Sequence, residues 1–492
     1  MTTPGGPATA PGGGVGPLTV TGGTGGTTAK YDDMETTAGL LGRASGDLLG
    51  VAATCHRYLA DPNVAASAVL DPVGAARFET AMAGALDGGD GLTWAAGQVG
   101  VQAVKLKAAV VTYRVTDDLQ ARLIDGLRFA GGAAAVLAAP ALIPAALAAA
   151  PAWVASELAQ GRNIGDDLQK LITDHPGIVD TIVGASPGAI TTVNALLLGP
   201  AAPLAGLIFK GTTGQTLFPT SPAEGAGLLG LLYPDGKPVV TDRGDDPAIA
   251  GTRPPQGVGD LMTALNYRNA QAGGADQGEI DVRTIEKTMP DGSIRKSYVV
   301  DVPGTKDWQF NPSGDRTHLN DFGTNLHALS GDTTAYEQGI ADALHRAGVQ
   351  PGDPVMLVGH SQGGIVAVHA ADQFVQSGQF NVTHVVTAGA PVARLSVPPS
   401  VQVLSLENQH DIVPHLDARD NPDLPNRTTV TFDRQYGTVG ENHGIDSSYT
   451  PAAVAVDSSG DPSIRHYLDS ASDFLDGDTA TSHVYQVTRD QN

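Results

Sequence analysis

The feature that most constrains the fold of this chain is a five-residue pattern, Gly-x-Ser-x-Gly, at residues 359–363. An apolar run at residues 355–358 comes directly before it, and a segment of helical composition at residues 364–374 follows. A strand, a sharp turn and a helix in this order hold a serine clear of a sheet, and the flanking glycines give the backbone room for the bend. The pattern therefore predicts helices packed on a sheet, with Ser361 as a candidate nucleophile.

A second copy of the pattern, at residues 184–188, lacks one chemical requirement. In this arrangement, the residue after the nucleophile donates its backbone N–H to a developing oxyanion. Pro187 has no N–H to donate, whereas Gln362 has one. We therefore expect Ser186 to lie in a loop or at a helix start, and Gln362 to supply an oxyanion donor.

Charge and cysteine content exclude several classes of function. The net charge is −23 and the pI is near 4.7, so a nucleic-acid backbone would repel the chain and is not an expected partner. Cys55 is the single cysteine, which excludes an intrachain disulfide and a zinc site built from thiolates. The phosphate-binding loop, the His-Glu-x-x-His motif and the EF-hand spacing do not occur, and we expect neither a metal nor a cofactor.

The first 258 residues divide by composition into three parts. Residues 1–29 are rich in Gly, Thr, Pro and Ala, which predicts a disordered tail without the basic and apolar regions of a secretory signal. We therefore expect a cytoplasmic location, or export without a cleaved signal peptide. Residues 30–128 carry helical periodicity, and residues 129–258 read as short helices and loops that connect to the next domain, with a cap over the active site as one option.

One segment of the connecting region is long enough to cross a membrane. Residues 129–155 are 27 residues without a charge, and residues 181–209 are a similar stretch. Against a membrane span stand Pro140, Pro144 and Pro151, together with the high alanine content. We favour buried helices, with membrane association as the alternative.

Two heptad-like seams run through residues 30–128. Both repeat small and apolar residues at steps of three and four, which predicts an antiparallel helical hairpin. On this interpretation Cys55 belongs to the core of the hairpin. The first seam is Met34, Ala38, Leu41, Ser45, Leu48, Ala52, Cys55 and Leu59, and the second is Leu92, Ala96, Val99, Ala103, Leu106, Val110 and Tyr113.

The predicted hairpin resembles the helical WXG-type substrates of actinobacterial type VII secretion. Those proteins carry Tyr-x-x-x-Asp/Glu near the end of the second helix, and Tyr113 and Asp117 match it here. They also carry Trp-x-Gly between the helices, whereas Trp94 is followed by two alanines. The resemblance covers about 100 residues and implies a helical partner or a secretion machinery as the ligand of residues 30–128.

Strands and helices alternate from residue 259 to residue 475. This alternation predicts an α/β fold with a mostly parallel sheet covered by helices on both faces, followed by a C-terminal tail at residues 476–492. Ligands of such sheets bind beyond the carboxyl ends of the strands, where Ser361 falls. The expected strands are 279–287, 296–302, 355–358, 383–388, 401–406 and 428–432, and the expected helices are 260–272, 332–347, 364–374 and 462–475.

A serine nucleophile needs a base, and the base needs an acid that orients it. In this type of fold, the acid and then the histidine follow the serine in the chain. Asp411 comes just after an apolar strand and before an apolar turn, where a carboxylate requires a reason to be present. We therefore expect Asp411 to be the acid.

The stretch around Asp411 also resembles a known pattern. Lipase-like α/β-hydrolases often carry Asn-x-x-Asp-x-Val-Pro at the acid, and Asn408, Asp411, Val413 and Pro414 match it. With the serine pattern at residues 359–363, residues 259–475 look like a lipase/esterase-type serine hydrolase. The resemblance implies an α/β-hydrolase fold and a small-molecule or lipid ester as substrate.

The histidine is the least constrained member of the set. His443 lies in a polar loop after the last expected strand, as the histidine of related lipases does, with Tyr449 as the nearby aromatic residue. His466 falls within a helix and is the alternative base, followed by His415 and His483. We expect His443 to be the base.

A second oxyanion donor is expected from the loop after an earlier strand. Residues 298–302 run into a Pro-Gly turn that resembles the oxyanion loop of lipases, with Thr305 or Lys306 as the donor. Trp308 would then line the acyl pocket or anchor the loop. His360 is expected to pack beneath the turn, or to line the substrate pocket.

The expected reaction is therefore hydrolysis of a carboxylic ester by Ser361, Asp411 and His443 through an acyl-enzyme. A thioesterase or acyltransferase with the same three residues is the close alternative. An interaction protein whose helical hairpin binds a partner, with the α/β domain as a passenger, is the alternative from another class.

Overall fold

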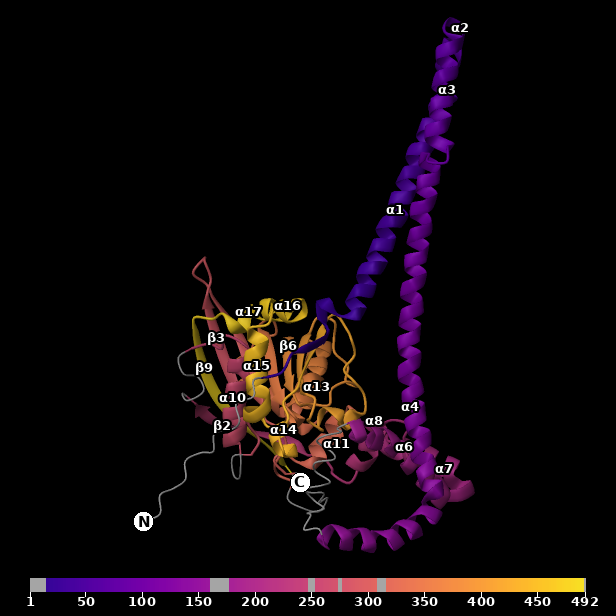
Figure 1. Ribbon diagram of the computed structural model, residues 1–492. Helices are drawn as coiled ribbons and strands as arrows, with labels where there is room; N and C mark the ends of the chain where they lie inside the picture. The colour runs from indigo at the N-terminus through magenta and orange to yellow at the C-terminus, as the bar shows by residue number, and fades with distance from the viewer. Residues whose placement is uncertain (1–14, 160–176, 247–252, 273–276, 308–315, 491–492) are drawn as a thin grey trace. The chain divides into compact units, whose positions relative to one another are not determined.

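The computed structural model describes residues 15–159, 177–246, 253–272, 277–307 and 316–490 (Figure 1). The chain forms two compact units, one made of residues 27–124 and the other of residues 1–26 and 125–492. Each unit is described by itself.

The larger unit is built on a mixed sheet of nine strands in the order β1-β8-β7-β6-β5-β4-β3-β9-β2. The five central strands, β4 to β8, run parallel to one another, and the outer pairs are antiparallel. The class is therefore mixed α/β, with a parallel centre as expected. The strands are β1 (Thr19–Gly22), β2 (Lys237–Asp245), β3 (Glu279–Thr288), β4 (Ile294–Val302), β5 (Pro354–His360), β6 (Asn381–Ala388), β7 (Gln402–Asn408), β8 (Arg427–Phe432) and β9 (Thr479–Asp490).

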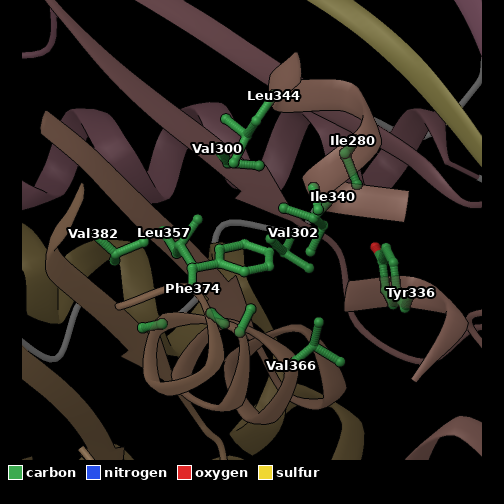
Figure 2. Close-up of a cluster of buried hydrophobic side chains, with 14 of the residues drawn as sticks. Ile280, Val300, Val302, Tyr336, Ile340, Leu344, Leu357, Val366, Phe374 and Val382 are labelled. Atoms are coloured by element: carbon green, nitrogen blue, oxygen red, sulfur yellow. The ribbon is translucent and has the colours of Figure 1, made fainter. Parts of the chain in front are cut away.

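Helices cover both faces of this sheet. Side chains alternate along a strand, so Leu357 of β5 faces one apolar cluster and Met356 the other. Figure 2 shows the first cluster, where Leu357 packs with Phe374 and Ile340. Helices α12 (Ala335–Arg346) and α13 (Gln362–Ser377) lie on that face, and α10 (Val258–Gln271), α15 (Thr450–Asp457) and α16 (Pro462–Ser470) lie on the other.

The C-terminal segment is not a tail. Residues 479–490 form β9, which pairs with β3 on one side and with β2 on the other. Its polar side chains concealed this role, because two of them are buried against charges: Ser482 donates a hydrogen bond to Asp281, and Arg489 pairs with Asp321. The prediction of a C-terminal tail at residues 476–492 was therefore wrong.

Two further strands come from segments that the composition assigned to a tail and to a connection. Strand β1, within the expected disordered tail 1–29, pairs antiparallel with β8, and the Gly25 N–H donates to Ser463 Oγ at 2.8 Å. Strand β2, within the expected connection 129–258, forms the far edge of the sheet beside β9. Threonine and valine in β1 and β2 favour a strand, but neither segment by itself reveals its partner.

The smaller unit is a helical hairpin, as the two seams predict. Its helices are α1 (Thr27–Leu59), α2 (Pro62–Leu70), α3 (Pro72–Asp87) and the first part of α4 (Leu92–Ala159). Among the described side chains up to residue 124, the buried residues of α1 and α4 all belong to the predicted seams, and Ser45 Oγ donates to the Ala96 carbonyl at 2.8 Å. Cys55 is partly exposed within the seam.

The secretion-like motif is only partly described. The side chains of Tyr113 and Asp117 lie outside the described residues. Trp94 is about half exposed at the start of α4, and Arg114 pairs with Asp32 of α1. The ion pair joins the two long helices beside the position of the motif.

The connecting region is largely helical in its described part. Helix α4 continues to residue 159, and the side chains of residues 137–159 lie outside the described residues, including most of the expected membrane candidate 129–155. By length and composition, one helical stretch among the described residues could cross a membrane, Val179–Thr213, with a mean hydropathy of 1.6. The remaining helices of the larger unit are α6 (Gly177–Leu198), α7 (Ala202–Thr213), α8 (Pro222–Gly230), α11 (Phe322–Ser330), α14 (Val439–His443) and α17 (Ser472–Leu475).

The second serine pattern serves helix packing. Ser186 lies inside α6 and donates to the Val183 carbonyl at 2.8 Å, so it is no nucleophile on a turn. Gly188 lies against α4, because a Cβ on it would stand 2.0 Å from the Phe129 carbonyl oxygen. A Cβ on Gly132 of α4 would likewise meet the Ala185 carbonyl oxygen at 1.8 Å. Glycine is required at both positions because the two helix backbones touch.

Removal of β9 tests its place in the sheet. A chain that ends at Gly477 loses the buried side chains of Val484, Tyr485 and Val487, worth about 4.5–9 kcal/mol at 1.5–3 kcal/mol each. Because whole domains are stable by about 5–15 kcal/mol, we expect the shortened chain to be insoluble or unfolded. Soluble yield and thermal unfolding measure this. A chain that ends at Asp490 is the control, and a folded chain ending at Gly477 would contradict the sheet order.

The stability of the larger unit should depend on pH through His384. Burial among Tyr467 and Phe474 lowers the pKa of His384 to about 4. In the unfolded chain the imidazole takes up a proton near its ordinary value of about 6.5, so the unfolded state binds more protons between pH 6.5 and 4. Stability present above pH 6.5 should therefore fall by up to about 3 kcal/mol as the pH drops to 4.

Urea unfolding at pH 7 and pH 4.5 measures this dependence. The His384→Gln variant is the control, since glutamine keeps a hydrogen-bonding side chain and does not titrate. The difference in unfolding free energy between wild type and variant should shrink toward low pH, and a difference that stays constant would contradict the assignment.

Candidate active site

Ser361 sits on a strained turn between β5 and α13. Its φ and ψ angles are 56° and −125°, a conformation that a residue with a side chain adopts only when its surroundings enforce it. The Ser361 N–H donates to the Ala388 carbonyl at the end of β6, at 2.9 Å. The turn therefore has the backbone geometry that the pattern predicts.

The glycines of the pattern are explained by close contacts of the backbone. A Cβ on Gly359 would stand 2.2 Å from the Gly363 carbonyl oxygen, and a Cβ on Gly363 would stand 1.9 Å from the Val302 carbonyl oxygen. A side chain at either position would push α13 away from β4 and β5. The bend around Ser361 depends on this close approach.

His443 and Asp411 are hydrogen-bonded as the sequence predicts. His443 Nδ1 lies 2.7 Å from Asp411 Oδ2, and the Asp411 carboxylate is fully buried. Asp411 follows β7, and His443 ends the short helix α14 after β8. The structure therefore brings together two of the three predicted side chains by a direct contact.

Two more donors hold the carboxylate of Asp411. Val413 N–H donates to Oδ1 at 3.0 Å, and the Tyr449 hydroxyl donates to Oδ2 at 2.5 Å. Burial, together with the Asp411 charge, raises the pKa of Tyr449 well above its ordinary value, so this hydroxyl keeps its proton and acts as a donor. The sequence pointed to Tyr449 as a nearby aromatic residue, but the role of its hydroxyl was missed.

Asn408 joins the end of β7, just before Asp411, to the loop that carries His443. Its Nδ2 donates to the Arg434 carbonyl at 2.8 Å and to the Asn442 carbonyl at 3.0 Å, one residue before His443. The asparagine of the Asn-x-x-Asp pattern thus fixes the loop that carries the histidine. Gly389 leaves room for the Asp411 carboxylate and the Tyr449 hydroxyl, since a Cβ at residue 389 would stand 2.8 Å from both Asp411 Oδ2 and the Tyr449 hydroxyl.

His360, the residue before Ser361, contacts His443 and so links the turn to it. The rings of His360 and His443 are tilted by 36° with their centroids 4.3 Å apart, and His360 Nε2 donates to the His443 carbonyl at 2.8 Å. Burial, and next the neighbouring His443, lower the pKa of His360 well below its ordinary value, so its ring is neutral. His360 therefore packs beneath the turn, and it does not line an open pocket.

The reactive atoms of the site are not engaged with other groups. Ser361 Oγ and His443 Nε2 are both buried, and neither has a hydrogen-bond partner among the described residues. The bond that would pass the serine proton to the imidazole is therefore not formed in this structure. Such catalytic hydrogen bonds are often long in resting sites and tighten when the substrate binds.

The other candidate bases lie elsewhere. His466 is exposed on α16, and burial, and next the charge of His466, lower the pKa of His384 in the first half of β6. Ser361 follows the carboxyl end of the neighbouring parallel strand β5, so His384 and Ser361 lie at different ends of the sheet. His415 bonds to Asp180 of α6 at 2.8 Å. His483 pairs with Asp242 and Asp245 in the outer strands. Of the four candidate histidines, His443 is thus the one whose ring contacts Asp411.

The proposed oxyanion donors lie at the ends of neighbouring strands. Gln362 is the first residue of α13, where backbone N–H groups have no intrahelical acceptor. Lys306 N–H donates to the Asn320 carbonyl at 2.8 Å, which removes Lys306 as a donor. Thr305 N–H has no acceptor among the described residues, so Thr305 is the remaining choice.

Gly304 brings this loop against the nucleophile. A Cβ on Gly304 would stand 3.0 Å from Ser361 Cβ and 2.9 Å from the His360 carbonyl oxygen. Trp308, the predicted wall of the acyl pocket, lies outside the described residues. Among the described residues, no cluster of His, Cys, Asp and Glu could hold a metal ion.

Comparisons with known proteins add little to this picture. No family model and no curated protein matches the chain. The solved structure of the product of gene lin2722 from Listeria innocua matches at 12% identity over 44% of this chain and 89% of that chain, with a TM-score of 0.21. A likeness of that degree carries no argument about fold or function.

The contact of Gly304 with the turn predicts a sensitive position. In Gly304→Ala the new methyl group pushes the loop away from Ser361, and displacements of about 1 Å can cost about 100-fold in rate. We expect kcat for an activated ester to fall about 10- to 100-fold, with little change in thermal stability. Gly352→Ala is the matched control, because a Cβ on Gly352 meets nothing within 4 Å. Equal activity of the two variants would contradict the geometry.

Proposed function

We propose that this protein is a serine hydrolase with an α/β-hydrolase fold, of the lipase/esterase type, that cleaves carboxylic esters. The observation that carries the proposal is the Asp411–His443 hydrogen bond beside Ser361 on its positive-φ turn. The three residues follow one another in the chain in the order that this fold uses.

The first half of the proposed reaction forms an acyl-enzyme. Ser361 Oγ attacks the ester carbonyl while its proton passes to His443 Nε2, and Asp411 stabilises the imidazolium. The carbonyl oxygen becomes an oxyanion that accepts hydrogen bonds from the N–H groups of Gln362 and Thr305. When the tetrahedral intermediate collapses, the C–O bond of the ester breaks and His443 returns the proton to the leaving alcohol.

Water completes the reaction by the same steps. His443 takes a proton from water, the resulting hydroxide attacks the acyl carbon, and the second tetrahedral intermediate releases the acid as His443 returns the proton to Ser361 Oγ. The buried hydrogen bond from Tyr449 to Asp411 keeps the carboxylate fixed through both halves. A thioester substrate, or an alcohol as the acyl acceptor, would use the same groups, and these variants form the alternative proposal.

For the helical hairpin, we propose binding of a helical partner or of a secretion machinery. Support comes from large apolar side chains on its outer faces, each more than two-thirds exposed, namely Val69, Leu70 and Val104. A hairpin with one buried seam leaves such residues in water, where a partner could cover them.

A fluorophosphonate probe tests the proposed nucleophile. The wild type should be labelled and should hydrolyse short-chain p-nitrophenyl esters, because the probe reacts with a serine that an imidazole activates. Ser361→Ala should abolish labelling, and His443→Ala should lower kcat by at least about 1000-fold, as expected for a triad that acts as a unit.

Ser186→Ala is the matched control, since Ser186 shares the sequence pattern but lies within α6. This variant should retain full labelling and activity. A folded wild type that takes up no probe and hydrolyses no ester would overturn the proposed function.

A further inference from the structure

One short segment holds both sides of the proposed oxyanion hole. Asn320, fully buried, donates from Nδ2 to the Pro303 carbonyl at 3.3 Å and to the Gly304 carbonyl at 3.0 Å. Its own carbonyl accepts the N–H groups of Lys306 and Asp307 at 2.8 and 2.9 Å. Four hydrogen bonds to one residue therefore fix the loop that carries Thr305.

The next residue of the segment holds the other donor. The Asp321 carbonyl accepts a hydrogen bond from Gln362 Nε2 at 2.7 Å. Gln362 is almost fully buried at the start of α13. The bond therefore attaches the side chain of Gln362, whose backbone N–H is the other proposed oxyanion donor, to residue 321. Residues 320 and 321 thus connect the two donor-bearing segments, which belong to different strand ends.

The last strand of the chain fixes this segment through Arg489. Arg489 Nη1 lies 2.9 Å from Asp321 Oδ2, and Nη2 donates to Thr324 Oγ1 at 2.6 Å. Asp321 also caps α11, accepting the Thr324 N–H at 2.8 Å. The guanidinium is almost fully buried and meets a second carboxylate, Asp235, at 2.8 Å from Nε.

The backbone of β9 reinforces the same attachment. Arg489 N–H donates to the Thr317 carbonyl at 2.7 Å, and its Nη1 donates to the Arg316 carbonyl at 3.2 Å. His318 forms a single antiparallel bridge with Thr488. The end of β9 therefore runs alongside the segment that holds the oxyanion donors.

We propose that Arg489 is a positioning residue of the active site, which sets the spacing of the two oxyanion donors through its ion pair with Asp321. The inference rests on the proposed function, because it assigns a role within that reaction. Arg489 touches no reacting atom. It fixes Asp321, and Asp321 and its neighbour Asn320 fix the N–H groups of Gln362 and Thr305.

The chemistry of the contact explains why arginine is suited to this position. A guanidinium presents its donors in one plane and bonds to a carboxylate in a fixed orientation, whereas an ammonium is a point charge. Oxyanion donors stabilise the transition state only when they are aimed at the position where charge develops. A small rotation of Asp321 would therefore lower the rate of acyl transfer more than it lowers ground-state binding of the ester.

The test compares Arg489→Met with the wild type in the full-length protein. We expect kcat for a p-nitrophenyl ester to fall about 10- to 100-fold, with KM changed less than about threefold. Affinity for a trifluoromethyl ketone, which forms a tetrahedral oxyanion on Ser361, should fall by the same factor as kcat. Arg489→Lys and Asp321→Asn, which keep the charge or the shape, should give intermediate losses in the same direction.

Arg427→Met is the matched control for the loss of a buried guanidinium. Arg427 is as buried as Arg489, but it donates to the carbonyls of Val392 and Leu395, away from residues 303–307 and Gln362. Its kcat per folded molecule should equal that of the wild type. An equal fall of kcat in both variants, or a fall that only follows the folded fraction, would overturn the positioning role.

The outcomes separate this inference from the proposed function. A wild type that hydrolyses no ester and takes up no fluorophosphonate overturns the function, and the inference with it. An active wild type with unchanged kcat in Arg489→Met overturns the inference alone. If Arg489→Met does not fold, Arg489→Lys and Asp321→Asn decide: a selective loss of kcat and of ketone affinity supports the role, and unchanged values in both overturn it.

Discussion

The close approach of α13 to the ends of β4 and β5 is the constraint on which the rest of the site depends. Gly359 and Gly363 permit it, because a Cβ on either would collide with a backbone carbonyl. This approach forces Ser361 into a positive φ, a conformation that costs about 1–3 kcal/mol and that the sheet and helix must hold in place. It also brings Gly304 of the neighbouring loop against Ser361 Cβ, so nucleophile and oxyanion loop are set by one packing contact.

The parallel centre of the sheet explains how residues far apart in the chain meet. Strands β4, β5, β6, β7 and β8 all end at the same edge of the sheet. The segment after each strand carries either a residue of the site or a residue that contacts one. A buried carboxylate is costly unless it is hydrogen-bonded, and Asp411 receives donors from Val413, Tyr449 and His443. The acid is thus a member of the core as well as of the site, which ties the orientation of His443 to the integrity of the fold.

The sequence predicted the parts of the fold whose signal is local. The strand, turn and helix around Ser361 carry apolar periodicity and glycine in neighbouring positions, and Asp411 is a charge between an apolar strand and an apolar turn. Strand β9 could not be recognised in this way, because Ser482 and Arg489 are polar residues whose burial depends on the distant Asp281 and Asp321. Tyr449 shows the same limit: a tyrosine directly before the apolar helix α15 is indistinguishable from plain core until its hydroxyl is seen on Asp411.

Three buried arginines form ion pairs on the side of the sheet where β3, β9 and β2 run antiparallel. Arg268, Arg283 and Arg489 each meet a carboxylate from β3, β4 or the segment before α11, and all three are almost fully buried. Buried ion pairs add little net stability, since the cost of removing both charges from water offsets their attraction, but removal of one partner is costly. Their effect is therefore on register: a one-residue slip of β9 would bury Arg489 without Asp321. Fixing the last strand in register fixes residues 316–321 beside it, and in this way a charge at the end of the chain is linked to the geometry around Ser361.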